Sequence, residues 1–170
     1  MKRVAVVGVD PGAKGAFCLL IPETKQIMFR NTTDNGRELL DWFNQIDAEF
    51  NLMVCMVEEV GFIRGSAGKS TINFGRSIER ANIFAEIAEV SKDSVRPKAW
   101  QKFIGVVVPQ NLAGEANAKK RPLFIKKEVA RIAKELYPKA DLFGPKGGLL
   151  DGRSDALMIA HYAARTINLQ

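Results

Sequence analysis

The sequence has few of the residues on which thiol chemistry and zinc binding depend. Its 170 residues include two cysteines and a single histidine. Cys18 and Cys55 lie in apolar stretches outside any CxxC motif, so we interpret both as reduced core residues. With His161 as the one imidazole in the sequence, a zinc site is not expected. These scarcities argue against disulfide frameworks, thiol catalysis and zinc chemistry.

Long hydrophobic runs are also missing. No apolar stretch approaches the roughly 18 residues that cross a bilayer, and residues 1–3 lead directly into a short β-like stretch rather than a signal-peptide core. We therefore expect a cytoplasmic protein that makes no contact with a membrane. Hydrophobic residues make up 46% and charged residues 26% of the sequence, as in ordinary globular domains. The length then predicts a single domain over residues 1–170.

The hydrophobic pattern predicts an α/β fold. A continuous β-branched run from Arg3 to Asp10 is typical of a buried central strand. Residues 16–21 and 26–31 predict two further strands, which complete a three-strand antiparallel meander. The other predicted elements are strands at 52–60 and 93–96, and helices from a cap at Asp34 to Phe50, at 70–90, at 97–103, over the basic segment to near Pro138, and at 151–167. Together they predict a mixed central sheet, with parallel strands added to the meander, flanked by helices.

The excess positive charge of the chain is concentrated in one segment. Between Lys119 and Lys139 there are eight basic residues and two acidic ones, which equals the net charge of +6 of the whole sequence. A surface that contacts a phosphate backbone requires such a local excess. A solvated lysine face is the alternative interpretation, and the segment alone does not separate the two.

Two predicted strands end in an acid. Asp10 and Glu58 each follow a comparable apolar run, at the point where a side chain can leave the core and face a site. Glu59 follows Glu58, and strand alternation sends these two neighbours to opposite faces. We expect Glu58 to join Asp10, with Glu59 as the weaker candidate.

Two further acids begin the last predicted helix. Asp151 and Asp155 are four residues apart, about 40° around the helix axis and roughly 6 Å along it, so they share a face. Helix capping is the competing explanation for Asp151, but it does not account for Asp155, which leads into an apolar stretch where an acid needs a partner. His161 lies about 120° from Asp155 around the helix and points away from this face.

Four carboxylates at one place repel each other and raise one another's pKa unless a cation is present. Oxygen ligands select hard ions such as Mg²⁺, for which Mn²⁺ can substitute. Two such ions about 4 Å apart activate a water and stabilise a leaving 3′ oxygen in phosphodiester hydrolysis. The predicted chemistry is therefore metal-dependent hydrolysis, with Asp10, Glu58, Asp151 and Asp155 as catalytic residues and metal ligands.

Five stretches of the sequence resemble, in order, motifs of the RuvC family of Holliday-junction resolvases, and most closely its phage and plastid type branch. They are Val9-Asp10-Pro11-Gly12 with Gly15, Val57-Glu58-Glu59-Val60, Ser70 to Ser77, Val95-Arg96-Pro97-Lys98-Ala99-Trp100-Gln101-Lys102, and Asp151-Gly152-Arg153-Ser154-Asp155-Ala156-Leu157. Each motif is modest by itself. Five in the same order are specific.

The resemblance implies a ribonuclease H-like fold and a homodimer that packs on its long central helix. It also implies a DNA-associated enzyme of a bacterial or phage-infected cell, which resolves four-way junctions by paired symmetric nicks. Such binding depends on phosphate contacts, for which the candidate residues are Arg76, Lys102, Lys119, Lys120 and Lys126.

The sequence departs from the family pattern at two places. The last two acids are four residues apart where the bacterial resolvases have three, and both spacings keep them on one helical face. Gly61 stands where an aromatic residue is expected, with Phe62 one place later, which favours a packing role for Phe62 over a wedge between bases.

Three alternative functions compete with this interpretation. The residues from Asp10 to Gly15 also resemble the first phosphate loop of actin-like and sugar-kinase ATPases, but those enzymes close two such domains around a nucleotide, so no nucleotide cofactor is expected here. A non-catalytic DNA-binding module gains nothing from concentrated negative charge facing phosphates. A ribonuclease H-like nuclease for branched DNA in general, or for RNA–DNA hybrids, stays open because the four acids specify hydrolysis and not the shape of the substrate.

Overall fold

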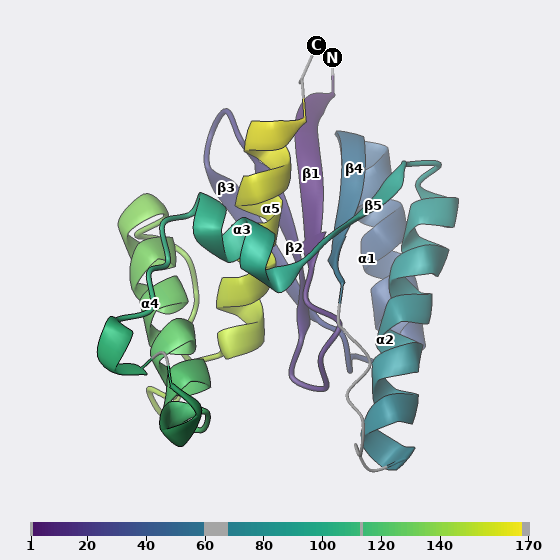
Figure 1. Cartoon of the computed structure of the whole chain (residues 1–170). Coiled ribbons are helices and arrows are strands. Elements are labelled where there is room, and N and C mark those ends of the chain that lie inside the picture. Colours follow the sequence, from purple (N-terminus) through teal and green to yellow (C-terminus); the bar gives the residue numbers. More distant parts are fainter. Residues whose placement is uncertain (1, 60–67, 113, 168–170) are drawn as a thin grey trace.

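A mixed five-stranded sheet forms the centre of the computed structural model, which describes residues 2–59, 68–112 and 114–167 (Figure 1). Its strands are β1 (Arg3–Val9), β2 (Ala16–Ile21), β3 (Gln26–Asn31), β4 (Phe50–Glu58) and β5 (Lys92–Val95), in the order β3-β2-β1-β4-β5. The first three strands pair antiparallel, while β4 is parallel to both β1 and β5. The predicted meander with added parallel strands is confirmed.

Helices connect and cover these strands. They are α1 (Gly36–Glu49), α2 (Gly68–Ile87), α3 (Pro97–Phe103), α4 (Lys120–Leu136) and α5 (Asp151–Thr166), with short 3₁₀ turns at Gln110–Leu112 and Glu115–Asn117. The prediction that Asp34 caps α1 is wrong by one residue. The Asn35 side chain accepts the N–H groups of Arg37 and Glu38, whereas the Asp34 carboxylate is hydrogen-bonded to Asn31.

The sheet separates two apolar cores. On one face, α1 and α2 cover an aromatic cluster that includes Phe17, Phe43 and Phe84. On the other face, α5 lies over the centre of the sheet with α3 and α4 beside it (Figure 1). Cys18 and Cys55 are free and buried on opposite faces, as predicted. Among the helices in the described part of the chain, none is long and apolar enough to cross a membrane.

Two glycines allow α5 to lie directly on the backbone of the first strand and the turn that follows it. A Cβ added to Gly8 would lie 2.3 Å from both the Ala156 carbonyl oxygen and the Ala160 nitrogen. A Cβ added to Gly152 would lie 2.0 Å from the Lys14 carbonyl oxygen. Contacts this short leave no room for any side chain. The first turn of α5 is therefore held beside the end of β1.

Candidate active site

The four predicted carboxylates come together at one end of the sheet. Asp10 and Glu58 lie at the carboxyl ends of β1 and β4, which are parallel neighbours. Asp151 and Asp155 lie on the first two turns of α5, which the glycine contacts hold against the same end of β1. Residues from three distant parts of the sequence thus meet at one edge, as parallel strand ends do in α/β sheets.

Burial and mutual repulsion raise the pKa of three of these groups. Burial is the largest cause for Asp10, opposed by a hydrogen bond from a backbone N–H of the following turn and reinforced by the charge of Asp151. Burial also raises the pKa of Glu58 to about 7, against the lowering effect of the Trp100 hydrogen bond. The pKa of Asp155 is raised well above its usual range, by burial first and then by the other three carboxylates. These mutual effects show that the four groups form one electrostatic unit.

A lysine from α4 reaches into this unit. The Lys126 ammonium forms a hydrogen bond and ion pair with Asp151 Oδ2, and its side chain is 48% exposed. This hydrogen bond is the largest cause that raises the pKa of Lys126, with the charges of Asp155 and Asp10 adding to it. The carboxylate of Asp151 therefore pairs with a side chain and does not cap α5, whose cap position is Leu150 without a side-chain hydrogen bond.

The structure sends the two adjacent glutamates in different directions, as strand alternation predicts. Glu58 Oε1 accepts a hydrogen bond of 2.9 Å from the indole N–H of Trp100, which has no exposed surface. Glu59 Oε2 instead pairs with Arg96 Nε at 3.2 Å on the surface. Glu58 is thus the member of the pair that belongs to the acidic unit, since the charge of Asp10 acts on it and its own charge acts on Asp155.

The donor chemistry of the site fits a hard divalent cation, although the side chains are not yet arranged around one. Carboxylate oxygens are the ligands that Mg²⁺ and Mn²⁺ prefer. The pKa values of Asp10, Glu58 and Asp155 are raised by burial first and by mutual repulsion second, and a cation would offset both. Within the residues that the structure describes, no group of three His, Cys, Asp or Glu side chains is arranged to hold a metal ion. Lys126 is one reason, because its ammonium takes up an oxygen of Asp151.

The turn after Asp10 is locked by residues that carry no catalytic chemistry. Its ends are joined by the hydrogen bonds from the Asp10 N–H to the Ala16 carbonyl and from the Gly15 N–H to the Gly12 carbonyl. The fully buried Thr32 hydroxyl donates to the Gly12 carbonyl at 2.9 Å. This turn fixes the backbone from which the Asp10 side chain projects.

The other predicted site residues lie outside the acidic unit. Arg76 on α2, Lys102 on α3, and Lys119 and Lys120 at the start of α4 are all exposed. His161 accepts or donates a hydrogen bond of 2.8 Å with the Tyr137 hydroxyl and takes no part in the site. The packing role predicted for Phe62, like Gly61 before it, falls outside the described residues.

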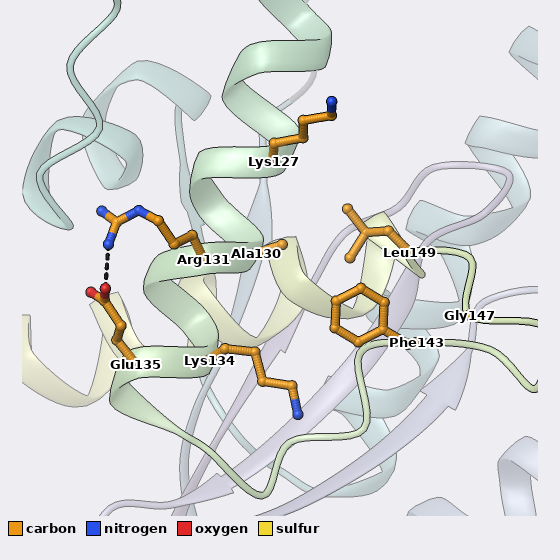
Figure 2. A pocket seen from close by; sticks show the side chains of 8 residues that line it. All are labelled: Lys127, Ala130, Arg131, Lys134, Glu135, Phe143, Gly147 and Leu149. Carbon is orange, nitrogen blue, oxygen red and sulfur yellow. Dashed lines mark hydrogen bonds and ion pairs between the residues drawn. The ribbon is translucent and has the colours of Figure 1, made fainter.

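A groove of about 610 Å³ lies along α4, where residues between Lys127 and Glu135 line it (Figure 2). Its apolar floor consists of Ala130, Phe143 and Leu149, and Lys127 stands at one end. Arg131 is paired with Glu135, as Figure 2 shows, and also with Glu128. Lys134 donates to backbone carbonyls of residues 138 and 140. Among the described residues that line the groove, Lys127 is the exposed cation for which no protein partner is found.

Sequence reasoning missed four contributors to the site. Gly8 and Thr32 look like an ordinary strand glycine and a turn residue, because their roles depend on elements that are distant in sequence. Trp100 was recognised as part of a motif but not as a partner of a carboxylate. Lys126 is a predicted DNA contact, but its pairing with Asp151 was not foreseen. No local signal reveals the partners of Gly8, Thr32 or Lys126.

Comparisons with known proteins identify the fold. No protein-family model matches the sequence, and no curated protein matches it. The structure is similar to that of T. thermophilus RuvC in complex with a Holliday junction substrate, with a TM-score of 0.60, 16% identity and coverage of 95% of each chain. A second Thermus thermophilus RuvC structure has a TM-score of 0.55 and 21% identity, again over 95% of each chain. The chain therefore has the ribonuclease H-like fold of the RuvC structures, as its motifs predict.

Proposed function

We propose that the protein is a metal-dependent endonuclease that resolves four-way DNA junctions by paired symmetric nicks. The observation that carries this proposal is the meeting of Asp10, Glu58, Asp151 and Asp155 in one electrostatic unit at the end of the sheet. The fold supports it, since the similar T. thermophilus RuvC was solved on a Holliday junction substrate. The activity would belong to the cytoplasm, where cellular or viral DNA recombines.

These four carboxylates are the proposed ligands of Mg²⁺, with Mn²⁺ as a substitute and two ions in each site. When bound, such ions lower the pKa of a water molecule and stabilise the leaving 3′ oxygen. The protein side chains prepare the site for this chemistry. Glu58, with a pKa of about 7, gives up a proton readily near neutral pH when a cation takes its place. Lys126 is half exposed beside Asp151, where its ammonium can stabilise charge on a phosphate that reaches the carboxylates.

The basic residues around the acidic unit are the proposed contacts for the DNA backbone. Lys119 and Lys120 are exposed at the start of the same helix that carries Lys126, and Lys102 and Arg76 are exposed on α3 and α2. Phosphate contacts of this kind fix the position of the DNA without reading its sequence. They predict an affinity that falls steeply as the salt concentration rises.

A homodimer would supply the second active site that a symmetric pair of nicks requires. The long helix α2 is the proposed contact, because it carries the apolar side chains of Ile72 and Ile83, which are 58% and 43% exposed. Apolar surface of this kind on a helix is typical of a face that packs against another protein chain. Sedimentation of the purified protein would test for the dimer.

The decisive experiment compares the cleavage of three substrates: a synthetic four-way junction, a linear duplex and an RNA–DNA hybrid. Each is incubated with Mg²⁺ or with EDTA, using the wild type and Asp10→Asn. The proposal requires metal-dependent paired nicks in the junction alone, absent in the variant. Cleavage of the hybrid, or of every branched form, would keep the nuclease and replace its substrate. Binding without any cleavage would replace the enzyme with a DNA-binding module.

A further inference from the structure

We propose that Trp100 is a positioning residue that holds Glu58 by one oxygen, so that the carboxylate is oriented for the cation that the acidic unit would bind. The inference rests on the proposed function, because it concerns the metal site of that enzyme. It adds a residue that the four carboxylates by themselves do not specify.

In the contact between the two side chains, Trp100 is always the hydrogen-bond donor and Glu58 the acceptor. An indole N–H can only donate a hydrogen bond, so it favours the ionised carboxylate and cannot remove a proton from it. The 2.9 Å distance from Nε1 to Glu58 Oε1 is that of a well-formed bond. Trp100 has no exposed surface and packs in the core on the α5 side of the sheet. Its ring is therefore held by packing, and the carboxylate is held by the ring.

The sheet register delivers the indole to this carboxylate. In the parallel pairing of β4 with β5, Glu58 lies opposite Val95. The backbone N–H of Glu59 donates to the Val95 carbonyl at 2.8 Å, which continues the pairing past the end of β4. Pro97 then begins α3, so that Trp100 lies within the first turn after the strand end. The donor is thus placed by strand pairing and not by a loop.

The same junction keeps the neighbouring glutamate away from the site. Arg96, which precedes α3, pairs with Glu59 on the surface, where the side chains are 79% and 50% exposed. An exposed pair of this kind contributes little to stability. The pair instead fixes where the side chain of Glu59 points. Glu59 has a cationic partner on the surface, whereas Glu58 has a buried hydrogen-bond donor on the side of the acidic unit. Two adjacent glutamates therefore receive different partners from one short segment.

One oxygen of Glu58 remains for a ligand. Within the described part of the chain, Oε2 accepts no hydrogen bond, while Oε1 is taken by the indole. The charge of Asp10 raises the pKa of Glu58, and the charge of Glu58 raises the pKa of Asp155, so the Glu58 carboxylate lies beside the acidic unit. A donor that holds one oxygen of a carboxylate fixes the direction in which the other oxygen points, which is how hydrogen-bonded partners orient metal ligands.

Two single-tryptophan proteins test the inference. Trp100→Phe keeps most of the ring volume and removes the N–H group. Trp42→Phe is the matched control, because Trp42 is 2% exposed in the core on the opposite face of the sheet. Mn²⁺ binding to the two variants and the wild type is measured by calorimetry without DNA. We expect Trp100→Phe to bind Mn²⁺ about 10-fold or more weakly than the wild type, and Trp42→Phe to bind it as the wild type does.

Fluorescence gives a readout that a purely structural role would not change. In Trp42→Phe the remaining fluorophore is Trp100, and its emission should shift when Mg²⁺ saturates the site, because the charge on its hydrogen-bond acceptor changes. The emission of Trp42 in Trp100→Phe should not shift. The fluorescence of Trp42→Phe also keeps the test valid if Trp100→Phe fails to fold.

Equal Mn²⁺ affinity in all three proteins, or an unchanged Trp100 emission in the presence of Mg²⁺, would overturn the inference alone. Absence of Mn²⁺ binding by the wild type would overturn both the metal-dependent function and this inference. Metal binding with the expected loss in Trp100→Phe, but no junction cleavage, would overturn the function and leave the inference standing.

Discussion

Raising the pH of the metal-free protein from about 5 to about 8 should lower its free energy of unfolding through Glu58. Burial raises the pKa of Glu58 to about 7 in the folded protein, compared with the ordinary value of 4.5 in the unfolded chain. Between these values the folded protein binds a proton that the unfolded chain has lost, so stability falls as the pH rises. At about 1.36 kcal/mol per pKa unit, the loss from this carboxyl is at most about 3 kcal/mol.

Denaturant unfolding in EDTA at several pH values measures this loss. Glu58→Gln removes the titrating group, so the difference between wild type and variant should change by up to about 3 kcal/mol across the range. His161, whose lowered pKa acts in the opposite direction, contributes equally to both proteins. The charge of Glu58 also helps to raise the pKa of Asp155, so its removal lowers that pKa and changes the difference in the same direction. Glu59→Gln is the matched control and should follow the wild type. Parallel curves for wild type and Glu58→Gln would refute the reasoning.

Three further predictions concern cleavage, DNA binding and packing. Asp10→Asn should abolish junction cleavage and spare junction binding, whereas Glu59→Gln should reduce cleavage much less. An equal loss of cleavage in the two variants would contradict the choice of Glu58 over Glu59. Lys120→Glu should weaken junction binding in a gel-shift titration and flatten its salt dependence, and an unchanged affinity would make this a solvated face. Gly152→Ala should lower the melting temperature and the cleavage rate, because the added Cβ would lie 2.0 Å from a backbone oxygen. Gly36→Ala is the control and should change neither, because open space surrounds its added methyl group. Similar behaviour of the two glycine variants would contradict the close packing of α5.

The sequence predicted the positions of the strand acids because each one interrupts an apolar run. The similar runs before Asp10 and Glu58 suggested neighbouring strands, and the structure pairs Val9 with Val57 directly before these acids. Alternation along one strand is a local property, which is why it also separated Glu58 from Glu59. Features that depend on one segment alone could therefore be predicted from the sequence.

Contacts between distant segments could not be predicted from the sequence. The cap of α1 was missed by one residue because Asp34 and Asn35 are both good capping residues, and only the hydrogen bonds of Asp34 to Asn31 decide between them. The pairing of Lys126 with Asp151 depends on how α4 packs beside α5. In the sequence, Lys126 is one of several lysines on a basic helix, and nothing local distinguishes it.

The packing of α5 on β1 has a consequence for when the acidic unit is assembled. Asp10 and Asp151 are 141 positions apart in the sequence, so a ribosome makes the first strand long before the last helix. Until α5 docks through Gly8 and Gly152, the growing chain carries the two strand acids without their helical counterparts. Contacts between such distant segments form late in folding. If the proposed function holds, a nascent or truncated chain without α5 is therefore inactive.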